Sequence, residues 1–266
     1  LRAERVGRAL ADFDAATIAT THGFSQQVLG GLGTAGDLAR DAELMEDTGD
    51  ILDEIVDDLY LARFRDAAGG PPFARDTARD IARAAVGNRD AVLEPTDAEP
   101  GGVPAARVDF ARDVRVTSAA RMRAMGVLGY DDLLTLLRDT LADGTTGAAA
   151  RARLRERYEV ALIDEFQDTD PVQWDIVRRA FADGTLVLIG DPKQAIYSFR
   201  GADVHTYLRA GADAGTRATL TTNWRSDQAL LEGCAALFGD ATLGHPDIPF
   251  RPVRAADPSR APGLTG

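Results

Sequence analysis

The sequence predicts an α/β fold in which a parallel sheet carries the functional residues and a long helical segment interrupts the chain. Two short apolar runs rich in β-branched residues, Val160–Ile163 and Leu186–Ile189, are typical of buried strands. Each run ends in polar residues, and a helical pattern lies between the two, as expected of strands in a parallel sheet. Residues 37–125 contain no such strand pattern, which indicates a helical insertion into the α/β core.

Composition limits the classes of protein to consider. The 266 residues suffice for one large or two modest domains, and a hydrophobic content of 45% excludes general disorder. A net charge of −12 argues against a generally basic nucleic-acid coat protein but leaves room for a local DNA-binding track. The single cysteine, Cys234, excludes an internal disulfide and a cysteine-rich metal centre, and it fits a reducing, cytoplasmic environment. No apolar run approaches the length that crosses a bilayer.

The first part of the chain predicts a helix over residues 1–11, then a strand over residues 15–21. His22 follows this strand and precedes a short helix that reaches about residue 29. A histidine at a strand end could contact a phosphate or a base. It could equally cap the helix or lie in the core.

Residues 31–36 match the glycine pattern G-x-G-x-x-G of dinucleotide-binding proteins. That fingerprint requires a strand directly before it and a βαβ unit around it. Here a predicted helix precedes the glycines and an acidic helical stretch follows them, so the sequence predicts a loop.

The insertion begins with an apolar stripe at helical spacing between Leu44 and Phe64. Residues 69–72, Gly-Gly-Pro-Pro, break the pattern, and another helix is predicted over residues 75–86. An exposed loop over residues 94–105 and a helix over residues 107–125 complete the segment. It carries no catalytic pattern, and its charges are typical of a solvated face.

The first strand of the core is followed by two acids. Helices are predicted over residues 130–141 and 148–157, and the strand Val160–Ile163 then leads into Asp164 and Glu165. Ligands of open α/β sheets bind beyond the carboxyl ends of the strands. One carboxylate could hold Mg²⁺ and its neighbour could position or deprotonate an attacking water. An ordinary solvated pair at a helix start is the alternative.

The second strand also ends in polar residues. Pro171 suits the first position of a helix that runs to residue 181, before the strand Leu186–Ile189. Gln194 follows this strand and is suited to contact a phosphate or a catalytic water. Tyr197, Phe199 and Arg200 combine two ring faces with a cation, which can stack unpaired bases and hold their backbone. A half-buried hydrophobic turn is the alternative for these three residues.

A third strand is predicted at Thr219–Thr222, followed by a helix over residues 227–238. Between the two lie Trp224, which could stack on a purine, and Arg225, which could reach a phosphate as an arginine finger does.

The order of these pieces resembles the UvrD/RecB-like superfamily 1 DNA helicases, in particular their RecB-like branch. Ile163–Asp170 resembles the family's motif II, Ile189–Asp203 its motif III and Thr222–Ser226 its motif IV. Thr21–Phe24 is similar to the segment that contacts single-stranded DNA, and Tyr130–Leu134 to the family's Asp-Asp-Leu-Leu segment. Motifs II and III are long and specific, whereas the other three matches would be weak alone.

The resemblance implies a role for each matching residue. Asp164 would hold Mg²⁺ through its water shell, Glu165 would be the general base, and Gln194 would sense the γ-phosphate of ATP and couple it to DNA. Arg225 would stabilise transition-state charge from a second motor domain, and Trp224 stands where the family usually stacks a tyrosine on adenine.

Contact with single-stranded DNA is implied for four further residues. Tyr197, Phe199 and Arg200 would bind the strand, with Phe199 at a position that is often tryptophan, and His22 would lie along the DNA path.

The fold implied is an incomplete RecA-like P-loop NTPase core that uses ATP and Mg²⁺. Residues 1–36 and 126–216 would form the first motor domain, residues 37–125 the insertion, and residues 217–266 the start of a second motor domain. The phosphate loop Gly-x-x-x-x-Gly-Lys-Ser/Thr is absent from the chain. Because the family places that loop before the Thr-His-Gly-Phe segment, Leu1 is expected to begin in mid-domain. The isolated chain is expected to bind and hydrolyse ATP poorly.

The activity implied is that of a motor in an ATP-dependent DNA helicase, within a helicase–nuclease of the exodeoxyribonuclease V type. Such an enzyme processes double-strand ends for recombinational repair. Its partners would be single-stranded DNA, duplex DNA ends and RecC- and RecD-like subunits. Two alternatives stay open: a monofunctional repair helicase of the same superfamily, and a non-catalytic DNA- or partner-binding module without a phosphate loop.

Overall fold

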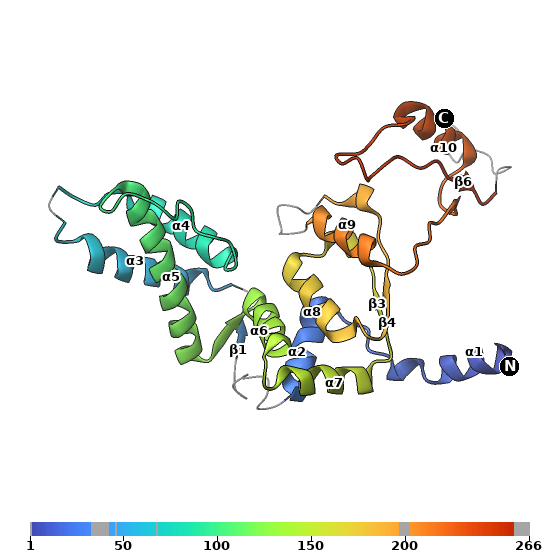
Figure 1. Cartoon of the computed structure of the whole chain (residues 1–266), viewed down its shortest axis with the longest axis horizontal. Helices are drawn as coiled ribbons and strands as arrows, with labels where there is room; N and C mark the ends of the chain where they lie inside the picture. Colours follow the sequence, from blue (N-terminus) through green and yellow to red (C-terminus); the bar gives the residue numbers. More distant parts are fainter. Residues whose placement is uncertain (1, 33–42, 46, 68, 197–202, 258–266) are drawn as a thin grey trace. The chain divides into compact units, whose positions relative to one another are not determined.

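The computed structural model describes residues 2–32, 43–45, 47–67, 69–196 and 203–257, and Figure 1 shows the order of its elements. The chain divides into two compact units, Leu1–Ala152 and Arg153–Gly266. Within the described residues, helices are combined with three two-stranded sheets, and each of these strand pairs is parallel. The predicted mixture of helices and parallel strands is therefore confirmed.

The first unit opens with helix α1 (Arg2–Ala11), the 3₁₀ turn η1 (Phe13–Ala15) and helix α2 (Thr21–Leu32). The strand predicted over residues 15–21 is wrong, because residues 16–20 join no sheet and a helix begins at Thr21. The physical reason is a cap: the Thr20 hydroxyl accepts a hydrogen bond from the backbone N–H of Gly23 at 3.2 Å. His22 consequently lies in the first turn of a helix and not at a strand end.

The predicted helical insertion contains helices α3 (Gly49–Phe64), α4 (Arg75–Gly87) and α5 (Val103–Met125). Helix α5 begins four residues before its predicted start, because Pro104 occupies the first turn, where proline is well tolerated. The three helices pack around a core that includes four aromatic rings, each in contact with at least two of the others: Tyr60, Phe64, Phe73 and Phe110.

Two strands that the sequence did not predict precede and follow these three helices along the chain. Strand β1 (Glu43–Met45) pairs in parallel with β2 (Val127–Gly129), with Leu44 opposite Leu128. The expectation of helix at residues 43–45 is thus wrong. Each strand has only three residues, which is too short to show a period-2 pattern. The pairing brings together the two ends of the helical segment, 82 residues apart in sequence at Met45 and Val127.

Helices α6 (Tyr130–Ala142) and α7 (Gly147–Arg157) follow β2 and agree with their predicted ranges to within a residue. The carboxylate of Asp132 accepts a hydrogen bond from the N–H of Gly129 at 3.1 Å and so caps α6. The apolar face of α6 packs against α2, where Leu29 and Leu137 are fully buried.

The second unit contains strand β3 (Val160–Ile163), the 3₁₀ turn η3 (Phe166–Asp168), helix α8 (Pro171–Phe181) and strand β4 (Thr185–Leu188). Strands β3 and β4 pair in parallel, with Ile163 opposite Leu188, as expected of a β-α-β unit. The side chain of Asp170 caps α8 by accepting from the N–H of Gln173 at 2.8 Å, and Pro171 occupies the first helical position.

The prediction that β3 and β4 are buried is wrong for the described part of the chain. Val160 and Leu162 are 51% and 65% exposed. Within the described residues each of these strands pairs with a single neighbour, so its other edge has no strand beside it to help cover the side chains.

The unit continues with the 3₁₀ turn η4 (Pro192–Gln194), helix α9 (Val204–Asp213), strand β5 (Thr222–Asn223), helix α10 (Gln228–Phe238) and strand β6 (Arg254–Ala255). The third strand is shorter than the predicted Thr219–Thr222, because only Thr222 and Asn223 find partners in β6. No helix in the described residues is both long and apolar enough to span a membrane.

Candidate functional site

The acid pair Asp164 and Glu165 follows the last residue of β3, as predicted, and both side chains are exposed. The backbone N–H of Glu165 donates to Oδ1 of Asp164 at 2.9 Å. Glu165 adopts φ 50° and ψ 40°, and it is the only non-glycine residue with positive φ in the described part of the chain. A left-handed residue costs on the order of 1 kcal/mol, and such strain is concentrated at functional sites. The strand therefore ends in a strained turn at the carboxylates.

The side chain of Gln167 joins the ends of the two strands. It is only 2% exposed. Its Nε2 donates to Oε2 of Glu165 at 2.6 Å, and its Oε1 accepts from the backbone N–H of Asp191 at 3.0 Å. Sequence reasoning missed this residue, because the only available signal was a glutamine two positions after an exposed acid.

Gly190 makes this junction possible because it has no side chain. A Cβ atom at position 190 would lie 2.7 Å from Oε1 of Gln167 and 3.1 Å from the backbone nitrogens of Phe166 and Gln167. These distances are shorter than normal contacts, so a larger residue at this position would force the Gln167 amide or a strand end to shift.

The turn after β4 is organised around Asp191. Its Oδ1 accepts from the backbone N–H of Lys193 at 3.0 Å and from Nζ of Lys193 at 2.6 Å. Its Oδ2 accepts from Nε2 of Gln194 at 3.3 Å. Burial alone would raise the pKa of Asp191, but the hydrogen bonds from Lys193 outweigh it and lower the pKa. Gln194, predicted from the sequence, is thus tied through Asp191 to the same junction as Glu165.

A third carboxyl group lies near Glu165. Burial raises the pKa of Asp168, and the negative charge of Glu165 raises it further. Its Oδ1 is buried and has no hydrogen-bond partner among the described residues. The junction therefore concentrates acidic groups on one short turn.

The turn after β3 is packed through the aromatic ring of Phe166. Phe166 is 1% exposed, and its ring lies 5.3 Å from that of Trp174 on α8 and 5.9 Å from that of Tyr207 on α9. The hydroxyl of Tyr207 donates to the carbonyl of Gly190 at 3.2 Å. Both helices thereby contact the junction between the strand ends.

Trp224 and Arg225 lie in a separate turn after β5. Oδ1 of Asn223 accepts from the N–H groups of Arg225 and Ser226, each at 2.8 Å, and this fixes the backbone of the turn. Trp224 is 83% exposed, and Arg225 is also exposed. Within the described residues, no hydrogen bond or ion pair joins either side chain to Glu165 or Gln194.

His22 belongs to the first unit, where its ring packs edge-on against Tyr130 at 5.2 Å. Its Nε2 is buried and has no hydrogen-bond partner among the residues described. The DNA-contacting residues predicted at Tyr197, Phe199 and Arg200 lie outside the described residues, as do residues 33–36 of the glycine pattern.

Comparison with known proteins identifies the family of the chain. A sequence model of the UvrD/REP helicase N-terminal domain matches residues 3–215. The chain belongs to the UvrD/REP helicase family. The resemblance expected from motifs II and III is therefore confirmed.

Several curated relatives of this UvrD/REP-family chain carry the name RecBCD enzyme subunit RecB. The protein from Mycolicibacterium smegmatis is 52% identical over 255 residues, which cover 96% of this chain and 23% of the relative. The protein from Mycobacterium tuberculosis is 49% identical over 248 residues, covering 93% of the chain and 22% of the relative. The Escherichia coli protein is 44% identical over 154 residues, covering 56% and 13%. The chain thus spans less than a quarter of the length of these relatives.

In its described residues the chain offers carboxylate oxygens, which are hard ligands, but no preformed cage for a metal ion. In the described ranges, no three His, Cys, Asp or Glu side chains lie together as a metal site would require. Mg²⁺ in nucleotide sites is commonly held by one or two carboxylates together with water and phosphate oxygens. The exposed carboxylate of Asp164, whose Oδ1 accepts one backbone hydrogen bond, fits that mode of binding.

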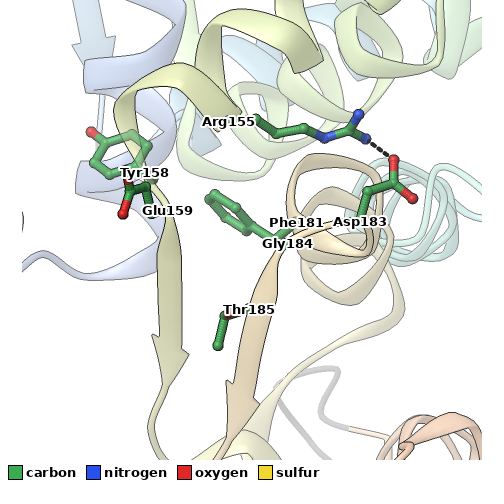
Figure 2. Close-up of a pocket in the computed structure, with 7 residues that line it drawn as sticks. All are labelled: Arg155, Tyr158, Glu159, Phe181, Asp183, Gly184 and Thr185. Carbon is green, nitrogen blue, oxygen red and sulfur yellow. Dashed lines mark ion pairs between the residues drawn. The ribbon is translucent and has the colours of Figure 1, made fainter.

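A cavity of about 470 Å³ opens at the other end of the β3–β4 pair, as Figure 2 shows. Glu159, which precedes β3, and Thr185, which begins β4, line it, and an ion pair between Arg155 and Asp183 at 2.6 Å borders it. None of the predicted site residues lines this cavity. In this UvrD/REP-family chain the acidic junction, at the carboxyl ends of the strands, is the better candidate for the site.

Proposed function

We propose that this chain is part of the motor of an ATP-dependent DNA helicase and translocase of the RecB type. The parent enzyme would be a helicase–nuclease that processes DNA double-strand ends for recombinational repair. The observation that carries the proposal is the junction at the carboxyl ends of β3 and β4. There, Gln167 links the Glu165 carboxylate to the backbone of Asp191 within segments that match motifs II and III. The family match over residues 3–215 supports it.

The proposed architecture is a RecA-like P-loop NTPase core. Residues 1–36 and 126–216 would belong to the first motor domain, residues 37–125 to its insertion, and residues 217–266 to a second motor domain. Support comes from the parallel β3–α8–β4 unit and from the short β1–β2 pair at the ends of the insertion. A phosphate loop would have to come from outside these residues. Its lysine in particular would have to come from there, because the only lysine of the chain, Lys193, is paired with Asp191.

In the proposed mechanism, Glu165 accepts a proton from the water that attacks the γ-phosphate of ATP. Asp164 would hold Mg²⁺, and the metal, when bound, would supply positive charge against the phosphates. Gln194 contacts the γ-phosphate. Arg225 stabilises the charge that develops on the transferred group, and the indole of Trp224 stacks on adenine.

DNA would be bound by two sets of residues. Tyr197, Phe199 and Arg200 would stack on bases and hold the backbone of single-stranded DNA, and His22 would lie along its path. The names of the curated relatives support RecC- and RecD-like subunits as partners. The parent enzyme would also bind duplex DNA ends.

The test is ATP-dependent unwinding of a blunt-ended duplex by the full-length protein that contains these residues, purified with its partner subunits. We expect unwinding that requires ATP and Mg²⁺, stops with a non-hydrolysable ATP analogue, and is accompanied by strand degradation. Unwinding without degradation would instead support a monofunctional repair helicase. DNA binding that is indifferent to ATP would contradict the proposal and support a non-catalytic module.

A further inference from the structure

A continuous series of hydrogen bonds runs from Glu165 to Gln194. The Glu165 carboxylate accepts from Nε2 of Gln167 at 2.6 Å, and Oε1 of Gln167 accepts from the N–H of Asp191 at 3.0 Å. The Asp191 carboxylate then accepts from Nε2 of Gln194 at 3.3 Å. Every step lies within the second unit and uses described residues. The two ends of the series are the side chains that the proposed mechanism places at the attacking water and at the γ-phosphate.

The chemistry of an amide makes Gln167 suited to the centre of this series. A glutamine side chain has one acceptor end and one donor end. The N–H of Asp191 can only donate, so it fixes Oε1 on its side and directs Nε2 toward Glu165. Since Gln167 is 2% exposed, water has little opportunity to replace either bond.

Close packing restricts how the series can rearrange. Gly190 approaches so closely that a Cβ atom there would lie 2.7 Å from Oε1 of Gln167. The backbone N–H of Phe166 donates to the carbonyl of Ile189 at 2.9 Å, which holds the two strand ends together beside the amide. A displacement of the Asp191–Gln194 turn would therefore displace the Gln167 amide, and with it the Glu165 carboxylate.

We propose that Gln167 is a positioning residue that couples Glu165 to Gln194, so that the state of the turn after β4 sets the catalytic geometry of Glu165. The proposal rests on the proposed function, since it assigns regulation to the same site. Tyr197, Phe199 and Arg200 begin three residues after Gln194 in the sequence. DNA bound to those residues would act on the turn, and Gln167 would transmit that action to the general base.

The test uses the full-length protein with its partner subunits and measures steady-state ATP hydrolysis with and without single-stranded DNA. Gln167→Met keeps the side-chain length but removes both hydrogen bonds. Gln167→Glu can still accept from Asp191 but presents a second carboxylate to Glu165. We expect each to lower DNA-stimulated kcat by about 10- to 100-fold while KM for ATP changes by less than about threefold. The ratio of DNA-stimulated to basal turnover should fall toward one.

The matched control is Gln173→Glu, which introduces the same charge in the first turn of α8, where the backbone N–H of Gln173 is held by Asp170. It should retain wild-type kcat and DNA stimulation. A thermal melt of each variant checks folding, and Gln167→Glu serves as the second variant if Gln167→Met is unstable.

A double-mutant cycle with Gln194→Ala tests the coupling itself. If Gln167 acts through the turn, the two losses should not add. DNA-stimulated kcat of the double variant Gln167→Met/Gln194→Ala should then be no lower than that of the more impaired single variant. Independent, multiplicative losses would overturn the proposal, as would normal DNA stimulation in Gln167→Met. Failure of the proposed function looks different: the wild-type protein would lack ATP hydrolysis, or Glu165→Gln would leave it intact.

Discussion

The side-chain oxygen of Gln167 accepts a hydrogen bond from the backbone N–H of Asp191 at 3.0 Å, across 24 positions of sequence. The same amide donates to Glu165 at 2.6 Å. These two bonds join the turn that ends β3 to the turn that ends β4. The candidate site is therefore one connected structure and not two motifs that happen to follow neighbouring strands.

The first prediction concerns the close approach at Gly190. Gly190→Ala would place a Cβ atom 2.7 Å from Oε1 of Gln167, so the amide or a strand end must shift. We expect a local loss of about 1–3 kcal/mol from overpacking. Hydrogen exchange of peptides that cover residues 163–194 in the full-length protein should accelerate, and ATP hydrolysis should fall with it.

The matched control for this prediction is Gly211→Ala. Gly211 lies in α9, and a Cβ atom there meets nothing within 4 Å. Alanine favours a helix over glycine by about 1 kcal/mol, so exchange in α9 should slow or stay unchanged. Equal effects of the two substitutions would mean that the approach at Gly190 is not tight.

The second prediction concerns the cap of α9. Asp203 accepts from the N–H groups of His205 and Thr206, each at 3.0 Å, and from the Thr206 hydroxyl at 2.7 Å. Burial alone would raise the pKa of Asp203, but these hydrogen bonds outweigh it and lower the pKa below the usual 3.8. Asp203→Ala should destabilise α9 by about 0.5–2 kcal/mol, measured by hydrogen exchange of α9 peptides at pH 7.

The pH dependence of this cap has a definite sign. Because the folded-state pKa is the lower one, the contribution is complete above the unfolded-state pKa and is lost as pH falls through the folded-state pKa. Asp203→Asn keeps an acceptor oxygen but cannot titrate. Its α9 should therefore lose less protection than wild type below about pH 4. A wild-type helix that gains protection on acidification would contradict this assignment.

The third prediction concerns the helical segment. The guanidinium of Arg115 on α5 donates to the carbonyls of Ala85, Asn88 and Ala91 at 2.9, 2.6 and 3.0 Å, and so satisfies the carboxyl end of α4 and the loop after it. Arg115→Ala should cost about 1.5–3 kcal/mol, since it removes charge-assisted hydrogen bonds. Faster hydrogen exchange at the end of α4 would report the loss.

Arg112→Ala is the comparison for Arg115. Arg112 lies on the same helix, its side chain is 61% exposed, and it pairs across one turn with Asp109 at 2.8 Å. An exposed pair of this kind contributes at most about 0.5 kcal/mol. If Arg112→Ala disturbed α4 as much as Arg115→Ala, the three carbonyl contacts would not be the cause.

Elements with strong local signals were predictable from the sequence. The β-branched run Val160–Ile163 predicted β3, and Pro171, which suits the first helical position, predicted the start of α8. The acids after β3 and Gln194 after β4 followed from the rule that sites lie at the carboxyl ends of parallel strands.

Features that depend on distant partners were not predictable. Strands β1 and β2 have three residues each and are defined only by their pairing. Residues 16–20 have strand-like composition but form no strand in the described structure, and the Thr20 cap starts a helix beside them. The role of Gln167 depends on Asp191, 24 residues away, and no local pattern in the sequence reports such a contact.

The most direct test of the account is ATP hydrolysis by the full-length protein carrying Glu165→Gln, measured with single-stranded DNA and alongside ATP binding. Removing a general base costs about 10²–10⁴-fold in turnover, while ATP and DNA should still bind. We predict a loss of that size with ATP affinity within a few-fold of wild type. Turnover close to wild type would contradict the assignment of Glu165, and with it the catalytic role proposed for the junction between β3 and β4.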